Sequence, residues 1–133
     1  MVEVVIDILI GDTTVQNLVG RNEVGDTYKI YPVITPQKEV HPYVTVRQTG
    51  KLEQAKNCGF AGSFAVFSYH KNYDQVKAID LAIVAALKAA PATDLFAYAI
   101  LTGTNDDFVT QANGDGLYSR ISTFDCSYDE SAT

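Results

Sequence analysis

Tryptophan is absent from this chain of 133 residues, and cysteine and histidine each occur only twice. The cysteines are Cys58 and Cys126, and the histidines are His41 and His70. Because these four residues form no Cys-x-x-Cys or His-x-x-x-His spacing, the sequence does not indicate a metal site. We expect both thiols to be free, since disulfides are rare in cytosolic proteins.

Basic residues are also few. Ten lysines and arginines stand against 16 aspartates and glutamates, which gives a net charge of −6. The excess of acid is concentrated from residue 105 onward, where six acidic residues accompany Arg120 alone. Such a chain lacks the clustered cations that bind a phosphate backbone. We therefore expect no sequence-specific nucleic-acid binding.

Long hydrophobic runs are missing as well. Residues 1–10 are apolar, but Glu3 and Asp7 interrupt them and no basic segment precedes them. This stretch therefore predicts neither a membrane span nor a signal peptide. A composition with 47% hydrophobic and 20% charged residues is typical of a globular protein with one core. We expect a single domain over residues 1–133 that is made in a cytosol and does not contact a membrane.

Several segments of the chain predict helices. Apolar residues recur at helical spacing over residues 2–9, although their β-branched side chains leave a strand open. Asp12 can cap a second, short helix over residues 13–19 that Gly20 ends. The clearest helix begins after the N-cap Asn72 and stops before Pro91. One stripe of this helix is expected to cover a sheet, and it comprises Val76, Ile79, Ile83, Ala86, Leu87 and Ala90.

Alternating and apolar runs predict the strands. Residues 43–48 alternate between apolar and polar, which is typical of a sheet with one solvent-facing side. Residues 63–70 are largely apolar on both faces, as expected of a central strand, and residues 96–102 and 117–128 add two more strands. The sequence therefore predicts an α+β fold: a mainly antiparallel sheet of about four or five strands, with an N-terminal helix and one long Ala-rich helix packed on one face.

Two polar insertions interrupt this pattern, at residues 50–62 and 103–116. Both are longer than a tight hairpin requires, and long loops on a small scaffold are either mobile tips or functional segments. Each insertion carries an aromatic residue that a solvated tip would not need, and this favours contact with a partner. In that interpretation the phenylalanines act as anchors and the charged residues set the register. The candidate partner-binding residues are Lys51, Lys56, Phe60, Asp106, Asp107 and Phe108.

Signatures of catalysis or cofactor binding are not found in the sequence. The run Asn113-Gly114-Asp115-Gly116 predicts a β-turn rather than a calcium loop, because the ligand series and closing Glu of an EF-hand are missing. No glycine-rich phosphate loop opens a helix. Asp106 and Asp107 would point to opposite faces of a strand, so they do not form a carboxylate pair. We expect neither an enzyme nor a cofactor, although a site that converges only in the fold stays open as a third reading.

The order of short segments between residues 30 and 74 is the most informative pattern. It reads Ile30-Tyr31-Pro32-Val33, then Thr35-Pro36-Gln37, then a strand opening at Pro42-Tyr43, and finally Asn72-Tyr73-Asp74 before the Ala-rich helix. In this order the segments resemble the tail-completion family of long-tailed bacteriophages, which comprises tail-terminator and other minor tail or neck proteins. The resemblance covers residues 12–87, with a looser match over residues 117–128, and no family motif is matched directly after Pro91.

This resemblance implies a small α+β fold with an N-terminal helix. It also implies assembly as a ring, commonly a hexamer, that caps the finished tail tube so that the tube can join the head. The partners would be further copies of the chain, the tail tube protein and a head-side connector protein. The location would be the tail or neck of a phage or prophage virion, after assembly in the bacterial cytoplasm. The family supplies no catalytic residues, and a non-viral binding module of the same shape is the alternative function.

Overall fold

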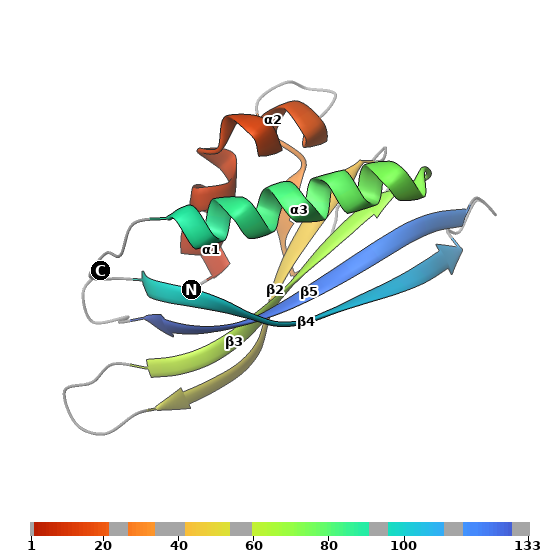
Figure 1. The fold of residues 1–133 in the computed structure, drawn as a ribbon. Helices are drawn as coiled ribbons and strands as arrows, with labels where there is room; N and C mark the ends of the chain where they lie inside the picture. Colours follow the sequence, from red (N-terminus) through yellow and green to blue (C-terminus); the bar gives the residue numbers. More distant parts are fainter. Residues whose placement is uncertain are drawn as a thin grey trace.

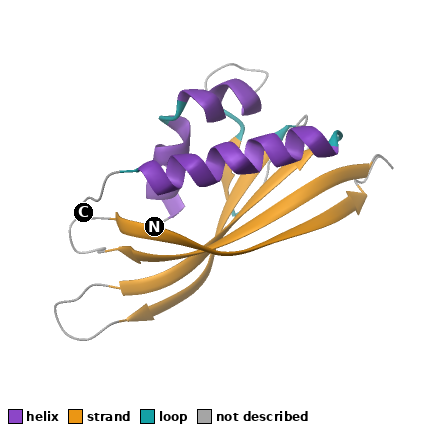
Figure 2. Ribbon diagram, in the orientation of Figure 1, coloured by secondary structure: helices purple, strands orange, loops and turns teal. Residues whose placement is uncertain are grey.

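A five-stranded sheet carries three helices on one of its faces (Figures 1 and 2). The structure is a computed structural model, and it describes residues 2–21, 27–33, 42–53, 60–90, 96–110 and 116–128. The helices are α1 (Val2–Ile10), α2 (Thr13–Val19) and α3 (Tyr73–Ala89). The strands are β1 (Ile30–Pro32), β2 (Tyr43–Glu53), β3 (Phe60–His70), β4 (Phe96–Thr110) and β5 (Gly116–Tyr128).

The strands lie in the order β1-β2-β3-β5-β4. Only β1 and β2 are parallel, and every other neighbouring pair is antiparallel. Strand β3 is therefore the middle strand, as its apolar side chains on both faces predict. The α+β class and the mainly antiparallel sheet with a long helix on one face are confirmed.

The two N-terminal helices form where the sequence predicts them. In α1 the side chains of Val5 and Leu9 are buried one above the other, because residues four positions apart share a helix face. In α2 the Oδ1 atom of Asp12 accepts a hydrogen bond from the backbone N of Val15 at 3.0 Å. Gly20 follows the helix with a φ of 77°, a conformation that favours glycine.

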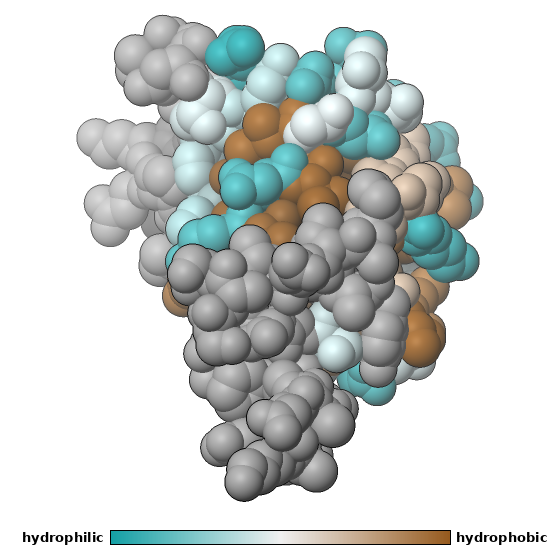
Figure 3. Space-filling model, turned by 90° about the vertical axis from the view of Figure 1, so that its left-hand side faces the viewer, coloured by the Kyte–Doolittle hydropathy of each residue, from teal (hydrophilic) through white to brown (hydrophobic). Residues whose placement is uncertain are grey.

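Helix α1 is apolar on more than its buried side. Val4, Ile6 and Ile8 are only partly buried although they pack against the core. Figure 3 shows a brown, hydrophobic area bordered by teal, hydrophilic atoms on the face that lies to the left in Figure 1, the side on which α1 lies. The partly buried side chains of α1 therefore leave some apolar surface in contact with solvent.

Helix α3 lies across the sheet and covers its core (Figure 1). Oδ1 of Asn72 caps the helix by accepting hydrogen bonds from the backbone N of Asp74 at 2.9 Å and of Gln75 at 3.4 Å. The predicted stripe is buried from Val76 to Leu87, and the helix ends at Ala89. Beneath it the rings of Phe64 and Phe124 stack with their centroids 5.1 Å apart.

The predicted extent of the two insertions is wrong, because strands occupy most of residues 50–62 and 103–116. Strand β2 continues to Glu53, β3 starts at Phe60, and β4 continues to Thr110. Asn and Asp have low strand preference, which is why residues 103–110 suggest a loop. Pairing with the 13-residue strand β5 overrides this preference. Asp106, Asp107 and Phe108 therefore lie in a strand rather than in a loop.

Cys126 is 2% exposed, and burial raises the pKa of its thiol to about 11. Because the thiolate is the reactive form, this cysteine is chemically protected at neutral pH. Cys58, His41 and the predicted turn at residues 113–115 lie outside the described residues. Within the described part of the chain, no helix has the length and hydropathy needed to cross a membrane.

Candidate partner-binding surface

Five side chains gather where α3 begins and where β4 ends and β5 begins. We call Tyr73, Asp106, Phe108, Tyr118 and Arg120 the arm cluster. Antiparallel pairing places Phe108 opposite Tyr118 and Asp106 opposite Arg120, so these four side chains share one face of the sheet. Tyr73 reaches them from the first turn of α3. The cluster therefore depends on three consecutive elements of the chain, α3, β4 and β5.

The three aromatic rings of the arm cluster contact one another while staying exposed. Phe108 meets Tyr118 edge to face with ring centroids 5.1 Å apart, and Tyr73 lies 5.5 Å from Tyr118. Phe108 is 57% exposed, Tyr118 39% and Tyr73 36%. Clustered tyrosine and phenylalanine side chains that reach solvent are the side-chain types that dominate protein–protein binding energy.

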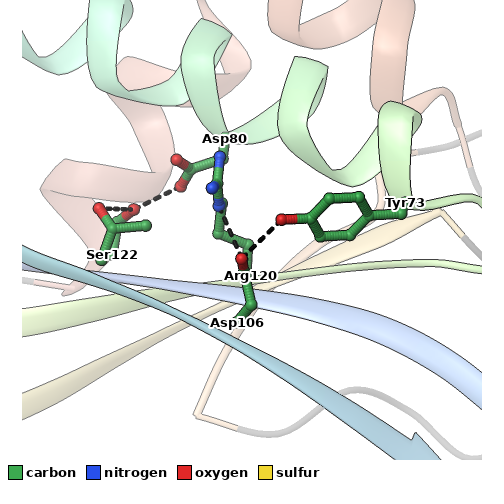
Figure 4. A network of polar contacts seen from close by, with 6 residues as sticks. Tyr73, Asp80, Asp106, Arg120 and Ser122 are labelled. Atoms are coloured by element: carbon green, nitrogen blue, oxygen red, sulfur yellow. Dashed lines mark hydrogen bonds and ion pairs between the residues drawn. The ribbon is translucent and has the colours of Figure 1, made fainter.

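A polar network joins the ring of Tyr73 to β4 and β5 (Figure 4). The hydroxyl of Tyr73 donates to Oδ2 of Asp106 at 2.6 Å, and Nε of Arg120 donates to Oδ1 of the same carboxylate at 2.8 Å. The hydrogen bond from Tyr73, followed by that from Arg120, lowers the pKa of Asp106. The same bond raises the pKa of Tyr73. An exposed ion pair adds little stability, so this network links α3 to β4 and β5 without contributing much to the free energy of folding.

Beneath the cluster a buried pair joins α3 to the sheet. Asp80 is 3% exposed and Ser122 is fully buried, and the Ser122 hydroxyl donates to Oδ1 of Asp80 at 2.5 Å (Figure 4). Burial raises the pKa of Asp80, and this effect outweighs the opposing hydrogen bond from Ser122 and the charge of Arg120. The pair therefore fixes α3 against β5 close to the arm cluster.

The ring of Phe108 lies over Gly116. A Cβ atom added to Gly116 would stand 2.1 Å from Cζ of Phe108, which is far inside van der Waals contact. Gly116 lies diagonally opposite Phe108 in the β4–β5 pair, on the same face of the sheet. The missing side chain of Gly116 provides the space that the ring occupies.

The structure brings only some of the candidate residues together. Asp106 and Phe108 lie in the arm cluster, whereas Asp107 points to the opposite face and accepts a hydrogen bond from the backbone N of Phe108 at 2.8 Å. Lys51 and Phe60 lie in β2 and β3. Lys56 lies outside the described residues. Whether any of them contacts a partner stays a prediction.

Phe60 and the arm cluster lie at opposite ends of the sheet. Phe60 pairs with Tyr128, whereas His70, ten positions further along β3, pairs with Tyr118. At about 3.3 Å per residue, ten positions correspond to roughly 33 Å. The backbone positions of Phe60 and Phe108, which were both predicted as anchors, therefore lie at opposite ends of the strands.

Several residues of this region are not among the sequence candidates. The omitted residues are Tyr73, Asp80, Tyr118, Arg120 and Ser122. A signal for Asp80 exists, because it lies four positions after Val76 and three before Ile83, on the apolar stripe of α3. Tyr118 and Arg120 are two positions apart in β5 and therefore lie on the same face of the sheet. The residues of β4 that lie opposite them can be identified only when the pairing register is known.

In the portion of the chain that the structure describes, no three His, Cys, Asp or Glu residues are grouped so as to hold a metal ion. Nδ1 of His70 accepts a hydrogen bond from the backbone N of Asn72 at 2.8 Å, next to the start of α3. This places His70 at the junction between β3 and α3.

The fold has a counterpart among solved structures. It is similar to a chain described as "Virion of native gene transfer agent (GTA) particle", with a TM-score of 0.58 and 17% sequence identity. The match covers 93% of this chain and 91% of the other chain. No known family matches the sequence, and no curated protein matches it. The two chains therefore share a fold over nearly their whole length.

Proposed function

We propose that this protein is a structural component of a phage or phage-like virion, not an enzyme, and that it completes the tail. In this role it caps the tail tube as a ring, of the hexameric type that the resemblance implies, and mediates joining of the head. The observation that carries the proposal is the shared fold with a chain of a gene transfer agent virion, which extends over 93% of this chain. The tail-completion assignment also draws on the order of segments between residues 30 and 74.

The two ends of the sheet support a role between two partners. The arm cluster exposes three aromatic rings at one end, and Phe60 and Lys51 lie towards the other end, roughly 33 Å away. A protein that joins a tail tube to a head-side connector needs contact surfaces that face in opposite directions. We assign one partner to each end.

The experiment that tests this function is electron microscopy of lysates with and without the gene. Overlong tails or tails without heads in its absence are the expected result, because the tube would lack its cap and its joint. Normal, infectious particles in the absence of the gene would overturn the proposal. That outcome would favour a non-viral binding module, for which the exposed aromatic rings of the arm cluster also provide a contact surface.

A further inference from the structure

Strand β4 forms one margin of the sheet, and within the described residues no strand lies on its outer side. Such an edge presents N–H and C=O groups to which a strand of another molecule can bind. From Thr104 to Thr110 the strand pairs with β5 without a register shift, and the side chains of these residues are exposed. This regular segment therefore has the geometry that strand pairing requires.

The usual protections of an edge strand are distributed unevenly along β4. The two register shifts lie between Phe96 and Tyr98 and between Leu101 and Gly103, so irregular geometry disturbs only the first half of the strand. Residues 104–110 contain neither lysine nor proline, which often protect exposed edges. The second half of β4 therefore needs another form of protection if it is to stay unpaired.

One hydrogen bond identifies the backbone groups that face outward. The backbone N of Phe108 donates to Oδ1 of Asp107 at 2.8 Å, so this N–H is directed to a side chain of its own strand rather than to β5. Phe108 and Tyr118 thus form a non-hydrogen-bonded pair, in which side chains lie close together, as the contact between their rings shows. Such pairs alternate with hydrogen-bonded ones in an antiparallel ladder. Residues 104, 106, 108 and 110 therefore all direct their N–H and C=O groups away from β5.

Asp107 occupies one of these outward N–H groups with its own side chain. A strand that docks on this edge would need the N–H of Phe108 for its ladder, so it would have to displace the Asp107 carboxylate. A hydrogen bond to a charged acceptor is stronger than one between neutral groups. The displaced carboxylate would also lie beside the new strand, where its desolvation opposes pairing.

The charge of Asp107 also acts against pairing with a second copy of the chain. Two β4 edges in antiparallel contact over the regular segment would bring Asp106 and Asp107 of one copy near the same residues of the other, and like charges on adjacent strands repel. Asp106 is paired with Arg120 at 2.8 Å, whereas residues 96–110 contain no base. We therefore attribute the larger part of this repulsion to Asp107.

We propose that Asp107 guards the β4 edge: its side chain blocks the N–H of Phe108 and its charge repels a second edge, so that residues 104–110 stay unpaired. Asp107 then prevents a contact, in contrast to the register-setting contact expected from the sequence. This role concerns pairing that the chain avoids, so it does not depend on the proposed virion function.

Amide hydrogen exchange, measured by NMR over a range of protein concentrations, tests this role. In the original chain, the outward amides of Thr104, Asp106 and Thr110 should exchange at rates that do not change with concentration. The Asp107→Val variant lacks both the acceptor and the charge, so its edge should pair as the concentration rises, and exchange of these amides should slow by roughly tenfold or more. At low concentration the Phe108 amide should instead exchange faster in the variant, because it has lost its acceptor.

Asp125→Val is the matched control, because Asp125 is an exposed acid on the same face of the sheet but lies in the inner strand β5. It undergoes the same loss of charge and gain of apolar surface, and the outward amides of β4 should exchange as in the original chain. Slower exchange of these amides in the original chain at high concentration would overturn the proposal, because the edge would then already be used for pairing. Unchanged exchange in Asp107→Val at every concentration would overturn it as well. Equal slowing in Asp125→Val and Asp107→Val would also contradict it, since added apolar surface rather than loss of the guard would then explain the association.

Discussion

The position of the Phe108 ring depends on the absence of a side chain at Gly116. We expect Gly116→Ala to displace this ring and to separate it from Tyr118, because the new Cβ would lie 2.1 Å from Cζ of Phe108. The ring is 57% exposed and can move, so the expected loss of stability is only about 1 kcal/mol. Urea unfolding measures the loss, and aromatic NMR shifts of Phe108 and Tyr118 report the separation of the rings.

Gly103→Ala is the control for this prediction. A Cβ at Gly103 would meet no atom within 4 Å, so the free energy of unfolding should change by less than about 0.5 kcal/mol. Equal effects of the two substitutions would show that the close approach of Phe108 to Gly116 has no energetic importance.

Buried Asp80 predicts a pH dependence of stability. Burial raises the pKa of Asp80 in the folded state. When the pH is below the ordinary pKa of an aspartate, Asp80 is protonated in both the folded and the unfolded chain. Burying the neutral group then destabilises the folded state least. As the pH rises, the unfolded chain releases the proton first, and stability falls until the folded state also loses it. The Asp80→Asn variant keeps a side-chain oxygen that can accept a hydrogen bond from Ser122, and its amide does not titrate. The stability of the original chain should therefore fall relative to this variant as the pH rises above the ordinary pKa of an aspartate, about 4.

Urea unfolding of both proteins at several pH values checks this expectation. Asp74→Asn serves as the charge-matched control, because Asp74 lies in the exposed first turn of the same helix. Parallel pH curves for the original chain and Asp80→Asn would contradict the raised pKa of Asp80.

Local chemistry explains which individual residues could be predicted from the sequence. Asp12 and Asn72 cap their helices through atoms two or three positions away, so their roles are legible in the sequence. The bond between Asp80 and Ser122 joins residues 42 positions apart, and no local pattern predicts it. Contacts of this kind depend on how α3 packs against the sheet.

Helix α3 is expected to depend on its N-cap. Asn72→Ala removes the acceptor for the backbone N–H groups of Asp74 and Gln75 and should cost about 1 kcal/mol. Asn72→Asp retains the acceptor and adds a negative charge at the helix N-terminus, so it should preserve or increase stability. Thermal unfolding of the two variants makes the comparison, and equal loss in both would show that the cap oxygen is not what stabilises this end of α3.

The length of strand β4 could not be predicted from the sequence. Its first part, up to Thr102, has an apolar pattern, whereas Asn105, Asp106 and Asp107 suggest a loop. These residues form a strand because β5 supplies a partner along their whole length, and because an edge strand leaves their side chains in solvent. A pairing partner is a property of the tertiary fold, so the sequence predicts that β4 exists but not how far it extends.

The two ends of the molecule are expected to have separable functions. Phe108→Ala removes the most exposed ring of the arm cluster, whereas Phe60→Ala changes the other end of the sheet. In a virion that requires this protein, one variant should give overlong tails and the other should give tails of normal length without heads. Electron microscopy of complemented lysates distinguishes these outcomes, and circular dichroism confirms that both variants are folded. The same phenotype from both variants would contradict the assignment of one partner to each end.

The overall architecture was more accessible from the sequence than the candidate site. The order of helices and strands followed from periodicity, caps and breakers, and it led to the correct fold class. The site residues were predicted as two loop sets, but the structure places Asp106 and Phe108 in a strand and separates Phe60 from Phe108 along the sheet, whereas the opposite faces of Asp106 and Asp107 agree with the alternation expected of a strand. Faces and distances of this kind depend on the pairing register, which the sequence alone does not specify.

The continuous pairing of β3 with β5 has a mechanical consequence. These strands lie side by side over eleven residue pairs and connect the two ends of the sheet. A pulling force between those ends acts along the strands, so it loads the hydrogen bonds of the ladder in shear, all at the same time. A force across the strands would instead break the bonds one after another. With one partner bound at each end of the sheet, as proposed above, tension between the partners would act along this strong direction of the subunit.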